Sequence, residues 1–309
     1  MSEFKRGVKL ALWTGFGLLL LYAVASVLVG ALFIKPQIHT ALVTHRPCMA
    51  DVPENWGFAP TDYRRIEFQS LDGLTLQGIF FPVENAKGVI VLTHGAADDA
   101  CAEFMLPLVP HLVDAGYAAL LPTLRNFGTS EGDLTSFGRT EWQDLAGAMS
   151  WLEDSTADEV PITLTGLSMS GGATLIAASK GYGDNIIVLS PFTRWVPMVT
   201  WRLKNDWGIP EAPAVLPSTF AVFLEFGSDG FETQPFDYVE EAGIAQPILI
   251  IGGRNDHMLP PCLLPGLQQA IGDNATLVWV DAGHNLVREG PTVVAKVADF
   301  MIEFLEEQQ

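Results

Sequence analysis

The sequence predicts an α/β fold, with a mostly parallel central sheet covered by helices on both faces. Two observations support this prediction. From about residue 63 onward, short apolar runs of strand length alternate with amphipathic segments of helix length. A hairpin pattern precedes the first of these strand–helix units. A third feature, an uncharged apolar run near the N-terminus, predicts a separate transmembrane helix.

The N-terminal run extends from Leu10 to Ile34, about 25 residues without a charge, and Lys5, Arg6 and Lys9 precede it. At about 1.5 Å per residue, a helix of this length crosses a hydrocarbon core of about 30 Å. We therefore expect residues 1–36 to form a membrane anchor. Basic residues before the run predict a cytoplasmic N-terminus and a globular body outside the cytoplasm.

A cleaved signal peptide is the alternative to an anchor. The segment Ala23-Val24-Ala25 places small residues at the spacing of a cleavage site. The apolar run continues past this point to Ile34, whereas a signal peptide normally turns polar soon after cleavage. The continuation favours an uncleaved anchor.

Residues 37–62 lack a clear periodicity and contain three prolines, so they predict a linker before a folded domain over residues 63–309. Within that domain, Asp72-Gly73 predicts the turn of a hairpin between strands at Arg64–Phe68 and Leu74–Phe81. Further strands are predicted at 88–93, 118–121, 161–165, 185–189, 247–251 and 275–280. Helices are predicted at 104–115, 141–152, 170–179 and 292–306.

One long stretch breaks this alternation. Roughly 55 residues separate Ser190 from Pro247, and they contain three tryptophans and four prolines within residues 195–217. This is longer than a simple crossover, so we expect an inserted cap at about residues 192–243. A long crossover helix followed by an irregular loop is the alternative.

A candidate nucleophile lies where a buried strand leads directly into a helix, in the segment Thr165-Gly-Leu-Ser-Met-Ser-Gly-Gly172. A serine can be exposed on such a sharp turn only if the residues two positions away are small. Gly166 and Ser170 meet this demand around Ser168. Ser170 itself, flanked by Ser168 and Gly172, is the alternative nucleophile. Taken alone, the segment also fits a helix N-terminus capped by serine, or an anion-binding turn.

A serine hydroxyl needs a base to take its proton and a third group to orient that base. His284 follows the last predicted strand, and Asp256 follows the strand at 247–251. Both therefore fall at carboxyl ends of strands, where open α/β sheets place their sites, and the order Ser, Asp, His suits this fold. His257 and Asp281 are the nearest alternatives for the two roles.

A carbonyl substrate also requires hydrogen-bond donors for the developing oxyanion. The segment Thr93-His-Gly-Ala96 follows a buried strand, and its glycine allows the backbone to turn an N–H toward the site. We predict that the backbone N–H groups of Ala96 and Met169 form this oxyanion hole.

From about Tyr63 to the C-terminus the chain resembles the α/β-hydrolase superfamily of serine esterases, lipases and peptidases. The resemblance rests on His94-Gly95, the Ser168 turn, the Asp256 and His284 loops, and Arg125-Asn-Phe-Gly-Thr-Ser130-x-Gly132 with downstream Asp144. This last segment is similar to the R-G-x-G-x-S-x-G segment of membrane-tethered esterase-like branches, with Asn126 in place of the first glycine.

The resemblance implies hydrolysis of an ester, thioester or amide, without a metal or organic cofactor. We expect an ester or thioester hydrolase that acts on a small or lipid-derived acyl substrate. A peptidase or amidase of the same fold is the first alternative, and a catalytically silent, membrane-tethered binding scaffold is the second.

The overall charge of the chain excludes one class of partner. The chain has 36 acidic and 17 basic residues, a formal net charge of −19. This charge repels phosphate backbones, so nucleic-acid binding is not expected. The 3 cysteines are too few and too scattered for a disulfide framework, although one pair could form outside the cytoplasm. Otherwise each cysteine is expected to be a small buried residue.

Overall fold

The computed structural model describes residues 2–47, 58–59, 61–96, 101–155, 160–232 and 234–309. The described chain divides into two compact units. One contains Met1–Ala41 and Trp195–Phe231, and the other contains Leu42–Arg194 and Glu232–Gln309.

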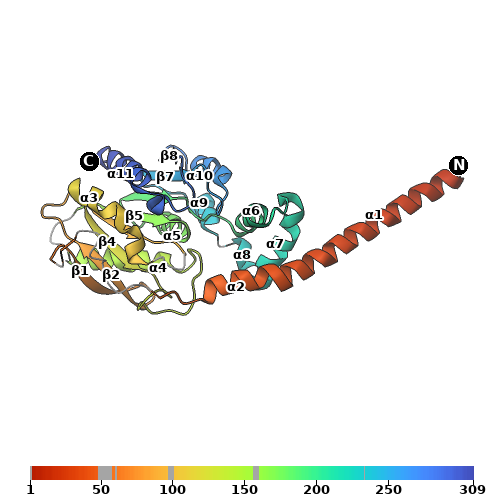
Figure 1. Cartoon of the computed structure of the whole chain (residues 1–309), viewed down its shortest axis with the longest axis horizontal. Coiled ribbons are helices and arrows are strands. Elements are labelled where there is room, and N and C mark those ends of the chain that lie inside the picture. Colours follow the sequence, from red (N-terminus) through yellow and green to blue (C-terminus); the bar gives the residue numbers. More distant parts are fainter. Residues whose placement is uncertain (1, 48–57, 60, 97–100, 156–159, 233) are drawn as a thin grey trace. The chain divides into compact units, whose positions relative to one another are not determined.

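An eight-stranded sheet forms the centre of the larger unit (Figure 1). Its strands lie in the order β1-β2-β4-β3-β5-β6-β7-β8. The pairs β1–β2 and β2–β4 are antiparallel, and all the other pairs are parallel. The strands are β1 (Arg64–Gln69), β2 (Thr75–Phe81), β3 (Val89–Thr93), β4 (Ala118–Thr123), β5 (Ile162–Leu167), β6 (Asn185–Leu189), β7 (Ile248–Gly253) and β8 (Ala275–Val280).

Helices cover both faces of this sheet, which confirms the predicted fold class. The 3-10 helix η3 (Ala102–Leu108), α3 (Val109–Asp114) and α11 (Pro291–Glu306) contribute to one apolar core. The second core contains side chains of α4 (Trp142–Ser155), α5 (Met169–Ser179), α9 (Pro235–Ala242) and α10 (Leu264–Ile271). Since β3, β6 and β7 are buried on both faces, they are largely continuous apolar runs rather than alternating ones. Two short 3-10 helices complete this unit, η4 (Pro261–Leu263) and η5 (Leu286–Arg288).

The smaller unit combines the N-terminal helix with part of the insertion between β6 and β7. The N-terminal helix comprises α1 (Ser2–Val29), a π-helical turn η1 (Gly30–Ile34) and α2 (Lys35–Val43). From the insertion come α6 (Trp195–Trp207), α7 (Glu211–Phe226) and α8 (Asp229–Glu232). Within the part of the chain that the structure describes, only the helix Gly7–Val43 is long and apolar enough to cross a membrane. That criterion also admits signal sequences, so membrane insertion stays a prediction.

Two predicted segment boundaries differ from the observed elements. The expected linker, 37–62, begins as helix, because α2 continues to Val43. The expected cap, 192–243, includes α9, but this helix packs in the second core of the larger unit through Val239. Whether α6–α8 cover the site remains a prediction.

The cysteines depart from the expectation that each is a small buried residue. Cys101 is buried and disulfide-bonded. Cys262 is free and exposed.

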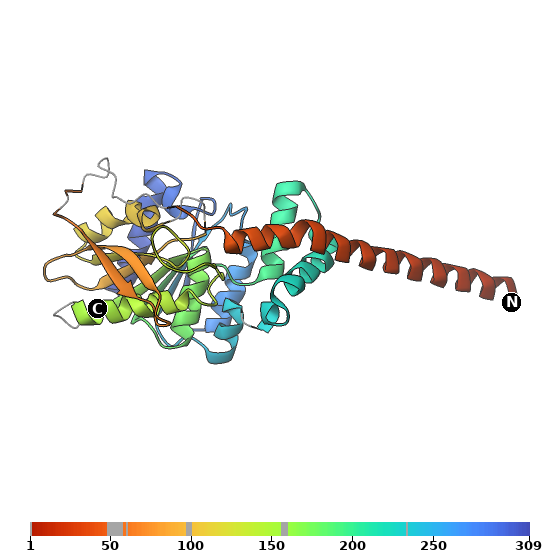
Figure 2. The same ribbon diagram turned by 90° about the horizontal axis from the view of Figure 1, so that it is seen from below.

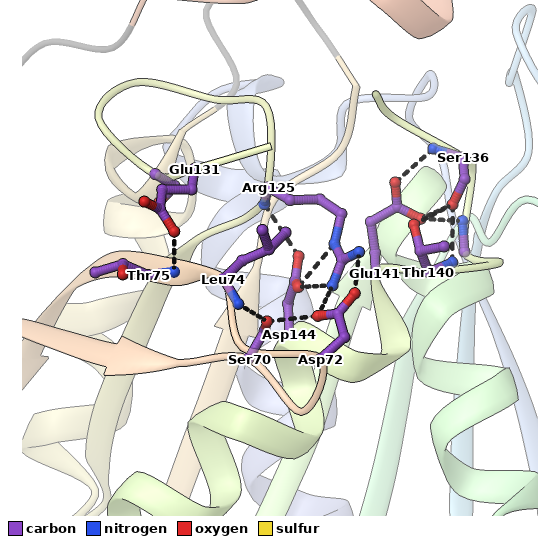
Figure 3. A network of polar contacts seen from close by, with 12 residues as sticks. Ser70, Asp72, Leu74, Thr75, Arg125, Glu131, Ser136, Thr140, Glu141 and Asp144 are labelled. Carbon is purple, nitrogen blue, oxygen red and sulfur yellow. Dashed lines mark hydrogen bonds and ion pairs between the residues drawn. The ribbon is translucent and has the colours of Figure 1, made fainter. Parts of the chain in front are cut away.

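A buried ion-pair network holds the connection between β4 and α4 (Figure 3). Arg125 Nη2 lies 2.7 Å from Asp144 Oδ1, and the backbone N–H of Arg125 donates to Asp144 Oδ2 at 3.0 Å. The same guanidinium also contacts both carboxylate oxygens of Asp72, in the β1–β2 turn, at 2.8 and 2.9 Å. Asp144 is fully buried, and burial raises its pKa to about 7, against the opposing effect of Arg125. The charge of Asp144 at neutral pH therefore depends on its partner.

His94 links the ends of β3 and β4. The backbone N–H of Leu124 donates to His94 Nε2 at 3.1 Å, and His94 Nδ1 lies 2.9 Å from the carbonyl oxygen of Gly95. These partners require a neutral ring with its proton on Nδ1. Complete burial lowers the pKa of His94 to about 4, which agrees with this assignment.

We expect Arg125→Met to lower the free energy of unfolding by about 3–5 kcal/mol, because it leaves the buried carboxyl group of Asp144 without its partner. The double variant Arg125→Met/Asp144→Leu should lose less than the single variant, as measured by urea denaturation. Lys87→Met is the matched control, since the pair between Lys87 and Glu306 is exposed, and it should cost at most about 1 kcal/mol. Equal losses for the single and double variants would contradict the proposed penalty.

His94 predicts a specific loss of stability in acid. Its folded-state pKa of about 4 lies below the usual value of 6.5. Between pH 4 and pH 6.5, this histidine is therefore more often protonated in the unfolded chain than in the folded protein. The free energy of unfolding should therefore fall as the pH drops from about 6.5 to about 4, by up to about 1.4 kcal/mol per pH unit from this group alone. In urea denaturation, His94→Asn should reduce this pH dependence, whereas the exposed His257→Asn should leave it unchanged. A parallel pH dependence in parent and His94→Asn would refute the assignment.

Candidate active site

Ser168 lies on a sharp turn between β5 and α5. Its backbone φ of 58° and ψ of −114° are rarely adopted by residues with side chains. The turn needs small neighbours because the chain folds closely on itself. A Cβ at Gly166 would collide with the carbonyl oxygen of Ser170, and a Cβ at Gly95 would lie 3.2 Å from Ser168 Cβ. The strained turn thus leaves the Ser168 side chain partly exposed at the end of β5.

Ser170, the alternative nucleophile, is fully buried and already hydrogen-bonded. Its Oγ lies 2.8 Å from the carbonyl oxygen of Thr93 and 3.1 Å from that of Leu167, and it accepts the Leu167 N–H at 2.9 Å. The hydroxyl therefore connects the end of β3 to the Ser168 turn. The sequence pattern revealed only that a small residue was needed at this position, not this hydrogen-bonding role.

The structure brings together the three residues predicted to act with one another. His284 Nε2 lies 2.8 Å from Ser168 Oγ, and His284 Nδ1 lies 2.7 Å from Asp256 Oδ2. Asp256 and His284 are both nearly inaccessible, with exposed fractions of 4% and 2%. Such burial excludes water from the link between the imidazole and the carboxylate and strengthens it.

The loops after β7 and β8 fix the positions of Asp256 and His284. The second oxygen of Asp256, Oδ1, accepts the N–H groups of Met258 and Leu259, both at 2.8 Å. A Cβ at Gly253 would collide with the carbonyl oxygen of Gly283, so the two loops approach each other closely only with glycine at this position. The backbone N–H of Asn255 also donates to the carbonyl oxygen of Ala282 at 3.0 Å.

The alternatives for the supporting roles occupy other environments. His257 is exposed. Asp281 is 83% exposed through its side chain and pairs with Arg254 at 3.2 Å. Asp256 and His284 are instead hydrogen-bonded to each other, and His284 also contacts Ser168; their catalytic roles stay a prediction.

The two residues predicted for the oxyanion hole flank Ser168. Met169 is the first residue of α5, a position whose N–H has no partner within the helix. Ala96 follows Gly95, and the contact between His94 Nδ1 and the Gly95 carbonyl holds the peptide group that carries the Ala96 N–H. The role of Ala96 and Met169 as oxyanion donors stays a prediction.

This arrangement can transfer a proton from a hydroxyl to an imidazole that a carboxylate orients. The residues that the structure describes contain no group of three or more His, Cys, Asp or Glu side chains suited to hold a metal ion.

Residues 53–202 match the family of X-Pro dipeptidyl-peptidases (S15 family), a range that includes Ser168 but ends before Asp256 and His284. Human protein ABHD12B is 28% identical over 238 residues, which cover 71% of this chain and 62% of ABHD12B. The thiohydrolase apmlB of Arthrinium phaeospermum is 26% identical over 197 residues, 59% of this chain and 61% of the relative. The chain thus spans about three fifths of the length of these relatives.

A solved structure provides a more complete match to the fold. The Pyrococcus furiosus esterase Pf2001 aligns with a TM-score of 0.67 and 20% identity, over 86% of this chain and 98% of the esterase. An alignment of this kind compares the fold rather than the activity. The strand order, the serine turn and these matches together establish that the chain belongs to the α/β-hydrolase superfamily.

Proposed function

We propose that the chain is a serine hydrolase that cleaves carboxylic esters or thioesters through an acyl-enzyme on Ser168. One observation carries the proposal, the continuous hydrogen-bonded chain from Ser168 through His284 to Asp256 at 2.8 and 2.7 Å. A serine hydroxyl becomes an effective nucleophile only when such a base accepts its proton.

The reaction proceeds in two stages. Ser168 Oγ attacks the substrate carbonyl carbon while His284 Nε2 accepts the hydroxyl proton, and Asp256 stabilises the imidazolium that forms. His284 then returns the proton to the leaving alcohol or thiol, and the acyl group remains on Ser168. In the second stage, water attacks the acyl-enzyme with His284 again as base, which releases the acid and restores the serine.

The oxyanion of each tetrahedral intermediate would accept hydrogen bonds from the backbone N–H groups of Ala96 and Met169. These donors are backbone groups on a short loop and a helix start, so they require little reorganisation when charge develops. The helix dipole of α5 adds a favourable field at the same point.

The preference for esters or thioesters draws on the relatives named as an esterase and as a thiohydrolase. A peptidase is the second candidate, and the match of residues 53–202 to the X-Pro dipeptidyl-peptidase family favours it. The substrate is a small or lipid-derived acyl compound. A silent binding scaffold would not react with a fluorophosphonate, which labels activated serines.

We further propose that the N-terminal helix anchors the enzyme in a membrane, with the α/β unit outside the cytoplasm. The disulfide at Cys101 supports this location, since disulfides persist mainly in oxidising compartments. The basic residues before the apolar run support the same orientation.

Labelling with a fluorophosphonate tests the nucleophile. The parent should be labelled, Ser168→Ala should not, and Ser170→Gly, which restores the common G-x-S-x-G pattern, should retain labelling. Persistent labelling of Ser168→Ala would transfer the role to another serine. An unlabelled parent would instead leave the binding scaffold as the better explanation.

Comparing kcat/KM for p-nitrophenyl esters, thioesters and aminoacyl amides then separates the esterase from the peptidase.

Asp256→Asn should lower kcat on the best ester by about 10³–10⁴-fold with little change in KM, because an amide no longer stabilises the imidazolium or the required tautomer. Steady-state kinetics with a soluble ester provide the measurement. The matched control is Asp281→Asn, since Asp281 lies on a neighbouring loop but is exposed. Equal losses in the two variants would remove Asp256 from the mechanism.

A further inference from the structure

The surroundings of the N-terminal helix change near Tyr22. Before this residue, large apolar side chains are exposed around the whole helix; those at least half exposed are Leu12, Trp13, Phe16, Leu18, Leu19, Leu20 and Leu21. After it, one stripe is buried at every fourth position, Ser26, Gly30, Ile34 and Ile38, while the other side still exposes Val24, Leu28, Leu32 and Phe33. The helix therefore has a protein-covered part and a part that no described element covers.

Helix α7 packs along the buried stripe. A Cβ at Gly30 would lie 2.6 Å from the carbonyl oxygen of Pro217, so the two helices approach closely at this glycine. Farther along, Glu225 pairs with Lys35 at 3.4 Å and with His39 at 2.7 Å, although its side chain is only 9% exposed. Figures 1 and 2 both show α7 beside the second half of the N-terminal helix, with the first half extending beyond it.

The direction of α7 follows from these contacts. At its other end, the hydroxyl of Tyr22 donates to the carbonyl oxygen of Pro213 at 3.0 Å. The two helices thus run in the same direction, from the contact between Tyr22 and Pro213 to the contact between His39 and Glu225. The start of α7 therefore lies nearest the uncovered part of the N-terminal helix.

The α6–α7 hairpin has its turn at this same end. Trp195, which starts α6, stacks on Phe226 at the end of α7 with ring centroids 4.8 Å apart, so the two helices run in opposite directions. The turn, residues 208–210, follows Trp207, which is 60% exposed. The hairpin thus presents a large exposed aromatic side chain at the level of Tyr22.

We propose that the turn of the α6–α7 hairpin, with Trp207, contacts the surface of a lipid bilayer beside Tyr22. This inference rests on the proposed membrane anchoring. Exposed apolar side chains on all sides of the helix before Tyr22 require a non-aqueous environment. Tyrosine and tryptophan are the residues enriched where such a helix leaves the hydrocarbon for the headgroups.

The length of the helix before Tyr22 is compatible with a bilayer surface near Tyr22. Leu10–Tyr22 extends about 20 Å as a helix, at 1.5 Å per residue. Because a lysine side chain can extend to the headgroups, Lys9 at one end and the phenol of Tyr22 at the other reach the two surfaces of a core about 30 Å thick.

The charges of the hairpin agree with a position in the headgroup layer rather than in hydrocarbon. Near the turn, Arg202 pairs with Asp206 at 2.7 Å, and Lys204 pairs with Glu211 at 2.6 Å. Such exposed pairs are tolerated among headgroups, whereas charges at the bilayer centre cost several kcal/mol each. From Ala212 to Leu224, α7 carries no charge, and Val215 next to the turn is exposed.

Depth-dependent quenching tests this proposal on the full chain. In a Cys262→Ser background, Trp207→Cys carries an environment-sensitive fluorophore, and the protein is reconstituted in phosphatidylcholine vesicles with nitroxides at different acyl-chain depths. Trp13→Cys is the reference for hydrocarbon, and the exposed Glu84→Cys is the reference for water. Fluorescence at position 207 should be lost mainly to nitroxides near the headgroups, at position 13 to nitroxides near the chain ends, and at position 84 to aqueous iodide alone.

Two other outcomes have distinct meanings. If position 13 is quenched by nitroxides but position 207 responds like position 84, the anchor is present and the proposed hairpin contact is wrong. If position 13 also responds only to iodide, the anchoring itself fails, and the hairpin contact fails with it. Retention of the protein in vesicles after a carbonate wash checks the anchor independently.

Discussion

The contact between His284 and Ser168 constrains the rest of the α/β unit. Together with the contact between His284 and Asp256, it requires side chains from the loops after β5, β7 and β8 to lie within hydrogen-bonding distance of one another. The parallel sheet provides this convergence, because its strands end at one edge. Close backbone approaches at Gly166 and Gly253 then bring the side chains into reach.

Most of this unit follows from sequence patterns. Buried strands such as β3 and β6 are continuous apolar runs, and the order Ser168, Asp256, His284 fits the fold. The predicted boundaries of these strands differ from the observed ones by only one or two residues. The sequence favoured Asp256 but left Asp281 as an alternative, since each follows a strand. Only the folded loops show that one carboxylate is buried against the imidazole and the other is exposed.

The insertion after β6 was much harder to predict. Its length indicated an additional substructure, but a helix such as α7 is apolar over most of its surface, so periodicity does not identify its partners. Its packing on the N-terminal helix joins residues about 190 positions apart. The role of Ser170 was equally hidden, because its hydrogen bonds depend on the end of β3.

The π-helical turn at Gly30–Ile34 has a consequence for the angular phase of the N-terminal helix. In a regular α-helix, positions four apart are rotated by about 40° relative to each other, so a stripe with this spacing would wind away from a straight neighbour. A π-helical turn contains an additional residue and corrects much of this rotation. Ser26, Gly30, Ile34 and Ile38 therefore stay on one side of the helix, and a single straight partner can follow them.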